Sequence, residues 1–130
     1  MIVLDASAAV EWLLQTASGV LVARRMFAPG ETLHAPHLLD VEVAQAFRRY
    51  VAARTLGVSR AEEALQDLTG LRVRRYPHLL FLRRVWELRD NLTAYDALYV
   101  ALAETLDATL VTCDRKIASA PGHQARVEVI

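Results

Sequence analysis

The sequence predicts an α/β fold of three layers, in which helices cover both faces of a mainly parallel central sheet of about five strands. Apolar runs at residues 2–4 and 109–112 have the length and composition of buried strands, and an aspartate closely follows each. Segments whose apolar residues recur at helical spacing lie between such runs. No linker, repeat or low-complexity segment interrupts the pattern, so we expect a single domain over residues 1–130.

The first third of the chain should contain a strand, two helices and a second strand. Because Ser7 closely follows the first apolar run, we expect it to cap the first helix. Pro29 and Gly30 should close the second helix. The expected elements are residues 2–4, 8–14, 18–27 and 32–35.

Pro36 opens a long helix that we place at residues 37–53. One face of it is apolar at helical spacing, with Leu39, Val43, Ala46, Phe47 and Tyr50. Glu42 lies at the edge of this face rather than on the solvent side. The pattern therefore predicts a partly buried carboxylate near the start of the helix.

The following segment is predicted to hold a helix, an edge strand and another helix. Ser59, with Glu62 three residues later, forms a capping-box pattern at the start of the first helix, which reaches about residue 68. Residues 71–74 alternate as an edge strand does, and Pro77 should begin a helix through residue 88 or 89.

The last third is organised around a helix that starts after Thr93. From residue 94 to residue 103 it carries one charge, Asp96, at the third helical position of a capping box. A helix that is apolar nearly all round is buried, and a buried carboxylate is costly unless it is paired or binds a metal. Strands should follow at residues 109–112 and 127–130, and the short segment around Pro121 leaves a helix between them undecided.

Composition excludes several classes of protein. Hydrophobic residues make up 54%, which predicts an extensive core, yet no apolar run approaches the ~20 residues of a membrane helix. The start of the chain has no signal-peptide pattern, and the single cysteine, Cys113, fits a reducing compartment, so we expect a cytoplasmic protein without membrane contact. The histidines lack zinc-type spacing, and a net charge of zero argues against avid non-specific binding of nucleic acid.

Four acidic residues occupy places that a parallel sheet can bring to one edge. Asp5 and Asp114 follow apolar strands, whereas Glu42 and Asp96 lie near the starts of helices. Carboxylates held together repel one another unless a divalent cation neutralises them, and oxygen-only ligands suit Mg²⁺ or Mn²⁺. Such an ion can activate water for the hydrolysis of a phosphodiester.

Ser7 and Thr112 are placed to orient these carboxylates or a water molecule from behind. Each acid also has an ordinary structural interpretation: Asp5 in a local turn, Asp114 in a strand-to-helix turn, and Glu42 in an ion pair with Arg48 or Arg49. Taken singly, none of these interpretations is excluded by the sequence. The functional interpretation depends on all four acids meeting.

Four blocks, in order over essentially the whole chain, resemble the PIN-domain ribonucleases and in particular the VapC-type toxins of type II toxin–antitoxin pairs. The blocks are residues 1–8, 36–43, 92–103 and 110–114. The resemblance implies a PIN-like fold in which Asp5, Glu42, Asp96 and Asp114 are the catalytic, metal-binding acids. Gln45 departs from the family, many members of which carry Asn at this position.

The resemblance further implies Mg²⁺- or Mn²⁺-dependent endonucleolytic cleavage of RNA, a homodimer, and a cognate VapB-like antitoxin that inserts a basic side chain near the acids. Arg115 and Lys116, beside Asp114, are candidates for contact with RNA phosphate, with a solvated turn as the other interpretation. A haloacid-dehalogenase-like phosphatase would need an aspartate where Ser7 stands. A receiver-like phospho-acceptor domain would need an acidic pair after the first strand. A PIN-fold binding module without catalysis would have lost one or more of the four acids.

Overall fold

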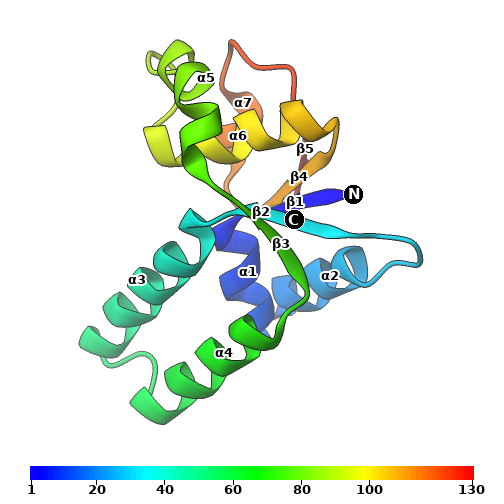
Figure 1. Cartoon of the computed structure of the whole chain (residues 1–130). Helices are drawn as coiled ribbons and strands as arrows, with labels where there is room; N and C mark the ends of the chain where they lie inside the picture. Colours follow the sequence, from blue (N-terminus) through cyan, green and yellow to red (C-terminus); the bar gives the residue numbers. More distant parts are fainter.

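Five short strands form one wholly parallel sheet at the centre of the molecule (Figure 1). The computed structural model describes all 130 residues. The strands are β1 (Ile2–Leu4), β2 (Leu33–Pro36), β3 (Val73–Tyr76), β4 (Thr109–Thr112) and β5 (Arg126–Val129), in the spatial order β3-β2-β1-β4-β5. The predicted parallel sheet is confirmed, with β3 as an edge strand.

Helices cover both faces of this sheet, as the three-layer prediction requires. Figure 1 shows α1 to α4 on one face and α5 to α7 on the other. The first group is α1 (Ala6–Leu13), α2 (Ala17–Met26), α3 (Leu38–Ala52) and α4 (Val58–Gly70). The second group is α5 (Leu82–Glu87), α6 (Ala94–Leu106) and α7 (Arg115–Ser119), and a 3₁₀ turn, His78–Phe81, leads into α5.

The order of the strands reverses between β1 and β4, which lie side by side. The chain leaves β1 for α1 on one face and leaves β4 for α7 on the opposite face (Figure 1). Leu4 is in register with Val111, and the N–H of Asp5 donates to the Val111 carbonyl at 3.0 Å. Such a switch point leaves a crevice beyond the carboxyl ends of the two strands, where ligands bind in open α/β sheets.

A single hydrophobic core extends over both faces of the sheet. The strand residues of β1 are fully buried, and so is nearly all of α6 from Ala97 to Ala103, which explains why that helix is apolar on every side. Gly19 lets α2 approach α1 closely, because a Cβ atom there would lie 2.1 Å from the carbonyl oxygen of Glu11. Its lack of a side chain is a packing requirement of this contact.

Two predicted helix caps are wrong. Asp5, not Ser7, is the N-cap of α1, because its carboxylate accepts the N–H of Ser7 and the helix already begins at Ala6. Gly57, not Ser59, is the N-cap of α4, which makes no side-chain capping bond. In α4 the guanidinium of Arg60 donates to the carbonyl of Leu13 at 2.6 Å, a tertiary contact that fixes the first turn in place of a capping box.

Other boundaries and faces differ in detail. Strand β3 begins two residues later than predicted, because Val73, rather than Leu71, is in register with Leu33 of β2. Tyr50 is exposed rather than buried with the rest of its helix face, whereas the next residue, Val51, packs against the core. The undecided helix before the last strand does form, as α7. No single helix is long and apolar enough to cross a membrane, and the apolar pair formed by α1 and α2 is bent by 111°.

Candidate metal-dependent active site

A cavity of about 660 Å³ lies beyond the carboxyl ends of β1 and β4, and all four predicted acids line it. Asp5 comes from the β1–α1 junction, Glu42 from α3, Asp96 from α6 and Asp114 from the β4–α7 junction. As placed, no three His, Cys, Asp or Glu side chains form a ready-made metal site. The fold therefore gathers the carboxylates around one space without drawing them into contact.

Asp5 is the most buried of these acids, with 5% of its surface exposed. Its Oδ2 atom accepts hydrogen bonds from the Ser7 hydroxyl at 2.5 Å and the Thr112 hydroxyl at 2.8 Å, and from the Ser7 N–H at 3.3 Å. Its Oδ1 atom accepts none from the protein. One oxygen is thus fixed and the other is left for the cavity.

Ser7 and Thr112 join the ends of β1 and β4 through this carboxylate. The N–H of Cys113 donates to the Ser7 hydroxyl at 2.9 Å, and the N–H of Asp114 donates to the Thr112 hydroxyl at 2.9 Å. Each hydroxyl has a single proton, which it gives to Asp5, so the 3.1 Å contact between the two hydroxyl oxygens is not a further hydrogen bond. The two predicted orienting residues therefore act on the same oxygen.

Glu42 is half-buried and accepts the Tyr99 hydroxyl at 2.6 Å through Oε2. The suggested ion pair with Arg48 or Arg49 does not form. Burial raises the pKa of the Glu42 carboxyl, and the negative charges of Asp5 and Asp96 raise it further, while the Tyr99 bond opposes this. Burial likewise raises the pKa of the Tyr99 hydroxyl, so it remains protonated and donates.

Asp96 is the third residue of α6, as predicted, with Thr93 as N-cap: the N–H of Asp96 donates to the Thr93 hydroxyl at 3.1 Å. Burial raises the pKa of the Asp96 carboxyl. The charges of Asp5 and Asp114 raise it further, whereas Thr93 and Lys116 lower it. The negative charges of neighbouring acids thus contribute to the raised pKa values of both Asp96 and Glu42.

Asp114 is the N-cap of α7, and its Oδ1 atom accepts the N–H of Lys116 at 2.8 Å. The turn interpretation is correct, and the same residue lines the cavity. Arg115 and Lys116 are exposed and do not line it, although the charge of Lys116 reaches the Asp96 carboxyl.

The residues fit a hard divalent cation by the chemistry of their donors. All four are carboxylates, and no histidine or cysteine lines the cavity. In Asp5, Glu42 and Asp114 one oxygen is held by a protein donor and the other accepts no protein hydrogen bond. A cation would relieve the repulsion that raises the pKa values of Glu42 and Asp96.

Sequence reasoning misses two features of the site. The buried Tyr99 lies in an apolar run, although a buried tyrosine hydroxyl needs a partner, which here is Glu42. Arg49 is the one basic residue that lines the cavity, and its side chain makes no hydrogen bond or ion pair. Its position seven residues after Glu42, two turns along the same helix face, was the available signal.

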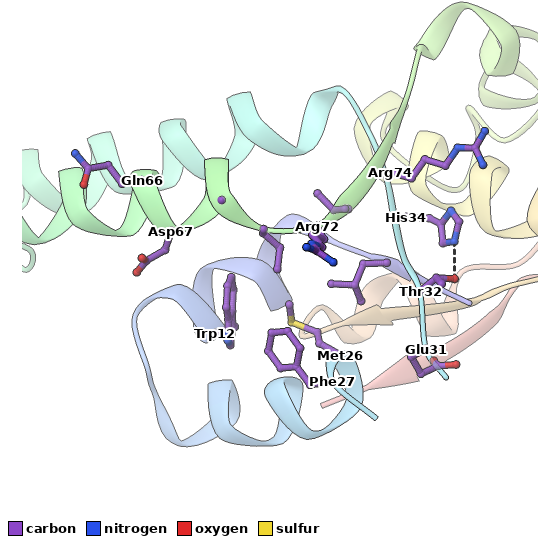
Figure 2. Close-up of a pocket in the computed structure, with 14 residues that line it drawn as sticks. Trp12, Met26, Phe27, Glu31, Thr32, His34, Gln66, Asp67, Arg72 and Arg74 are labelled. Atoms are coloured by element: carbon purple, nitrogen blue, oxygen red, sulfur yellow. Dashed lines mark hydrogen bonds between the residues drawn. The ribbon is translucent and has the colours of Figure 1, made fainter. Parts of the chain in front are cut away.

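A second, larger cavity of about 1350 Å³ lies at the amino ends of β2 and β3, away from the acids (Figure 2). His34 at its wall is bonded through Nε2 to the Thr32 hydroxyl at 2.9 Å and through Nδ1 to the Tyr76 hydroxyl at 2.8 Å. Burial lowers the pKa of His34. With both nitrogens satisfied, His34 has a structural role here.

Comparisons with known proteins agree with this geometry. Residues 2–122 match the PIN domain family. The chain is 45% identical to Ribonuclease VapC12 of Mycobacterium tuberculosis, covering 100% of this chain and 99% of that protein. Among solved structures, PAE2754 from Pyrobaculum aerophilum has a TM-score of 0.70 at 26% identity, covering 98% of this chain and 83% of that one. VapBC2 from Rickettsia felis, solved bound to a DNA fragment from its promoter, has a TM-score of 0.71 at 16% identity, covering 99% and 98%.

Proposed function

The chain belongs to the PIN domain family, as a member of the VapC type, and from this premise we propose that it is an endoribonuclease, the toxin of a type II toxin–antitoxin pair. The observation that carries the proposal is the meeting of four carboxylates from four separate elements around one cavity at the switch point of the sheet. A carboxylate cluster of this kind is suited to the hydrolysis of phosphodiesters with a divalent cation.

We assign Asp5, Glu42, Asp96 and Asp114 to the binding of Mg²⁺ or Mn²⁺. When bound, the cation supplies an activated water and neutralises charge on the phosphate. The protein contributes the placement of the carboxylates: Ser7 and Thr112 fix Asp5, and the backbone N–H of Lys116 fixes Asp114. Burial of the site limits competing water and strengthens its electrostatic interactions.

RNA is proposed to enter over the α3 side of the cavity. Arg49 lines this side without a partner and is therefore free to bind a phosphate, which Arg suits through its planar guanidinium. Tyr50 and Tyr95 line the same cavity and are exposed, as base-stacking side chains of single-strand binders are. We assign Arg115 and Lys116, the candidates from the sequence, to contacts with RNA phosphates further from the cavity.

The proposed partners follow from the family. We assign a VapB-like antitoxin whose basic side chain enters the acidic cavity, and a homodimer in the cytoplasm. Charge supports the first assignment, because a cation from the antitoxin would relieve the same repulsion that a metal ion does. The VapBC2 structure is a toxin–antitoxin assembly of a protein with the same fold.

The decisive experiment is Asp96→Asn. We expect this variant to lose Mg²⁺- or Mn²⁺-dependent cleavage of single-stranded RNA while its thermal unfolding remains cooperative. Asp107→Asn is the matched control, because it makes the same chemical change at the exposed end of the same helix and should keep full activity. Unchanged cleavage by Asp96→Asn, with contaminating nuclease excluded, would falsify the assignment.

A further inference from the structure

Glu42 differs from the other three acids in how it is held. Asp5 and Asp114 are N-caps, and Asp96 lies in the first turn of its helix, so backbone N–H groups of those helix starts are close at hand. Glu42 is the fifth residue of α3, beyond its first turn. Its carboxylate must therefore be placed by something other than its own helix.

The side chain of Glu42 is also the longest of the four. A glutamate loses more rotamer freedom than an aspartate when it is fixed, because its side chain has one more rotatable bond. The only protein hydrogen bond to its carboxylate is the one from Tyr99, across 57 residues of sequence, at 2.6 Å. Tyr99 itself is 0% exposed and is packed among the core residues of α6, so the donor is rigid.

We propose that Tyr99 is a positioning residue for Glu42: its buried hydroxyl holds Oε2 and leaves Oε1 available to a divalent cation. This inference rests on the proposed metal-dependent function. Tyr99 follows Asp96 by three residues on α6, so a single helix supplies one cation-binding carboxylate and places another.

The test compares Tyr99→Phe with the wild type by calorimetric titration with Mn²⁺, without RNA. Loss of a hydrogen bond behind a metal ligand weakens metal affinity roughly 10-fold or more, and we expect that loss here. Tyr76→Phe is the matched control: it removes a partly buried hydroxyl bond, to His34, away from the acids, and should leave Mn²⁺ affinity unchanged. Cleavage by Tyr99→Phe should fall at limiting Mn²⁺ and recover at saturating Mn²⁺.

The same substitution in a Glu42→Ala background isolates the contact between Tyr99 and Glu42. If Tyr99 acts through Glu42, the double variant should bind Mn²⁺ as well as Glu42→Ala alone. If Tyr99→Phe unfolds, 4-fluorophenylalanine at position 99 fills the space of the hydroxyl without a proton to donate and gives the same comparison.

The outcomes separate the two proposals. Wild-type protein that neither binds Mn²⁺ nor cleaves RNA would refute the proposed function. Wild-type protein that binds Mn²⁺, with Tyr99→Phe binding it equally well, would refute the positioning role alone. A further loss in the Glu42→Ala background would also refute it, because Tyr99 would then act through another group.

Discussion

Thr112→Val is expected to destabilise the protein by about 2–4 kcal/mol, because the Thr112 hydroxyl is the centre of the bonds that close the site. It is 0% exposed, donates to Asp5 at 2.8 Å and accepts the N–H of Asp114 at 2.9 Å. A hydrogen bond to a charged group contributes about 1.5–3 kcal/mol, and an orphaned N–H costs on the order of 1 kcal/mol more. Valine keeps the shape and the strand preference, so these losses are the main effect.

The assay is chemical and thermal unfolding in the presence of a chelator. For 130 residues the unfolding entropy is about 0.27 kcal/mol/K, so the loss corresponds to a fall in Tm of roughly 7–15 °C. Thr105→Val is the control: its hydroxyl bonds only the Ala101 carbonyl on an exposed part of α6, and the change should stay within about 0.5 kcal/mol. If Thr112→Val cost no more than this control, the bonds around Asp5 would not stabilise the fold as argued.

Three further predictions address charge, RNA and packing. Burial and the neighbouring acids raise the folded-state pKa values of Glu42 and Asp96, so the metal-free protein should lose stability as the pH rises from the ordinary carboxyl pKa of about 4 through those raised values. The rise in Tm produced by Mn²⁺ should therefore grow as the pH rises over this range, and a pH-independent rise in Tm would contradict this. Arg49→Ala should raise the KM for RNA and reduce the salt dependence of binding by roughly 0.7 in log–log slope, one phosphate contact, whereas Arg48→Ala, which does not line the cavity, should change neither. Gly19→Ala should cost about 1–3 kcal/mol in urea unfolding, because the new Cβ would lie 2.1 Å from a backbone oxygen of α1; an unchanged midpoint would show that the two helices can separate freely.

The sequence alone predicts the parallel sheet and the positions of the acids at its edge. Apolar runs locate buried strands, and parallel topology brings their carboxyl ends together, so the positions of Asp5 and Asp114 at one edge follow without coordinates. The cap pattern at Thr93 is confirmed, because its hydroxyl accepts the N–H of Asp96 within the same short segment. These features depend on local patterns that the tertiary structure does not override.

The features that the sequence did not predict depend on contacts between segments distant in the chain. Asp5 and Ser7 are both good N-caps, and the choice between them is made by Thr112, which binds Asp5 from β4. Ser59 matches a cap pattern that α4 does not use. The partner of Glu42 could not be read from its own helix, because Tyr99 lies 57 residues away.

The construction of the site explains how the protein can hold four carboxylates before any cation binds. Three of the acids lie at helix starts, where unpaired N–H groups carry partial positive charge worth about 0.3–1 kcal/mol to each anion. This offset is incomplete: burial, and after it the charges of the neighbouring acids, still raise the pKa values of Asp96 and Glu42. The proposed cation, or the basic side chain proposed for the antitoxin, would relieve the repulsion among the acids. The same charge would therefore favour the proposed metal ion during cleavage and the proposed antitoxin during inhibition, so we expect the two to compete for one site.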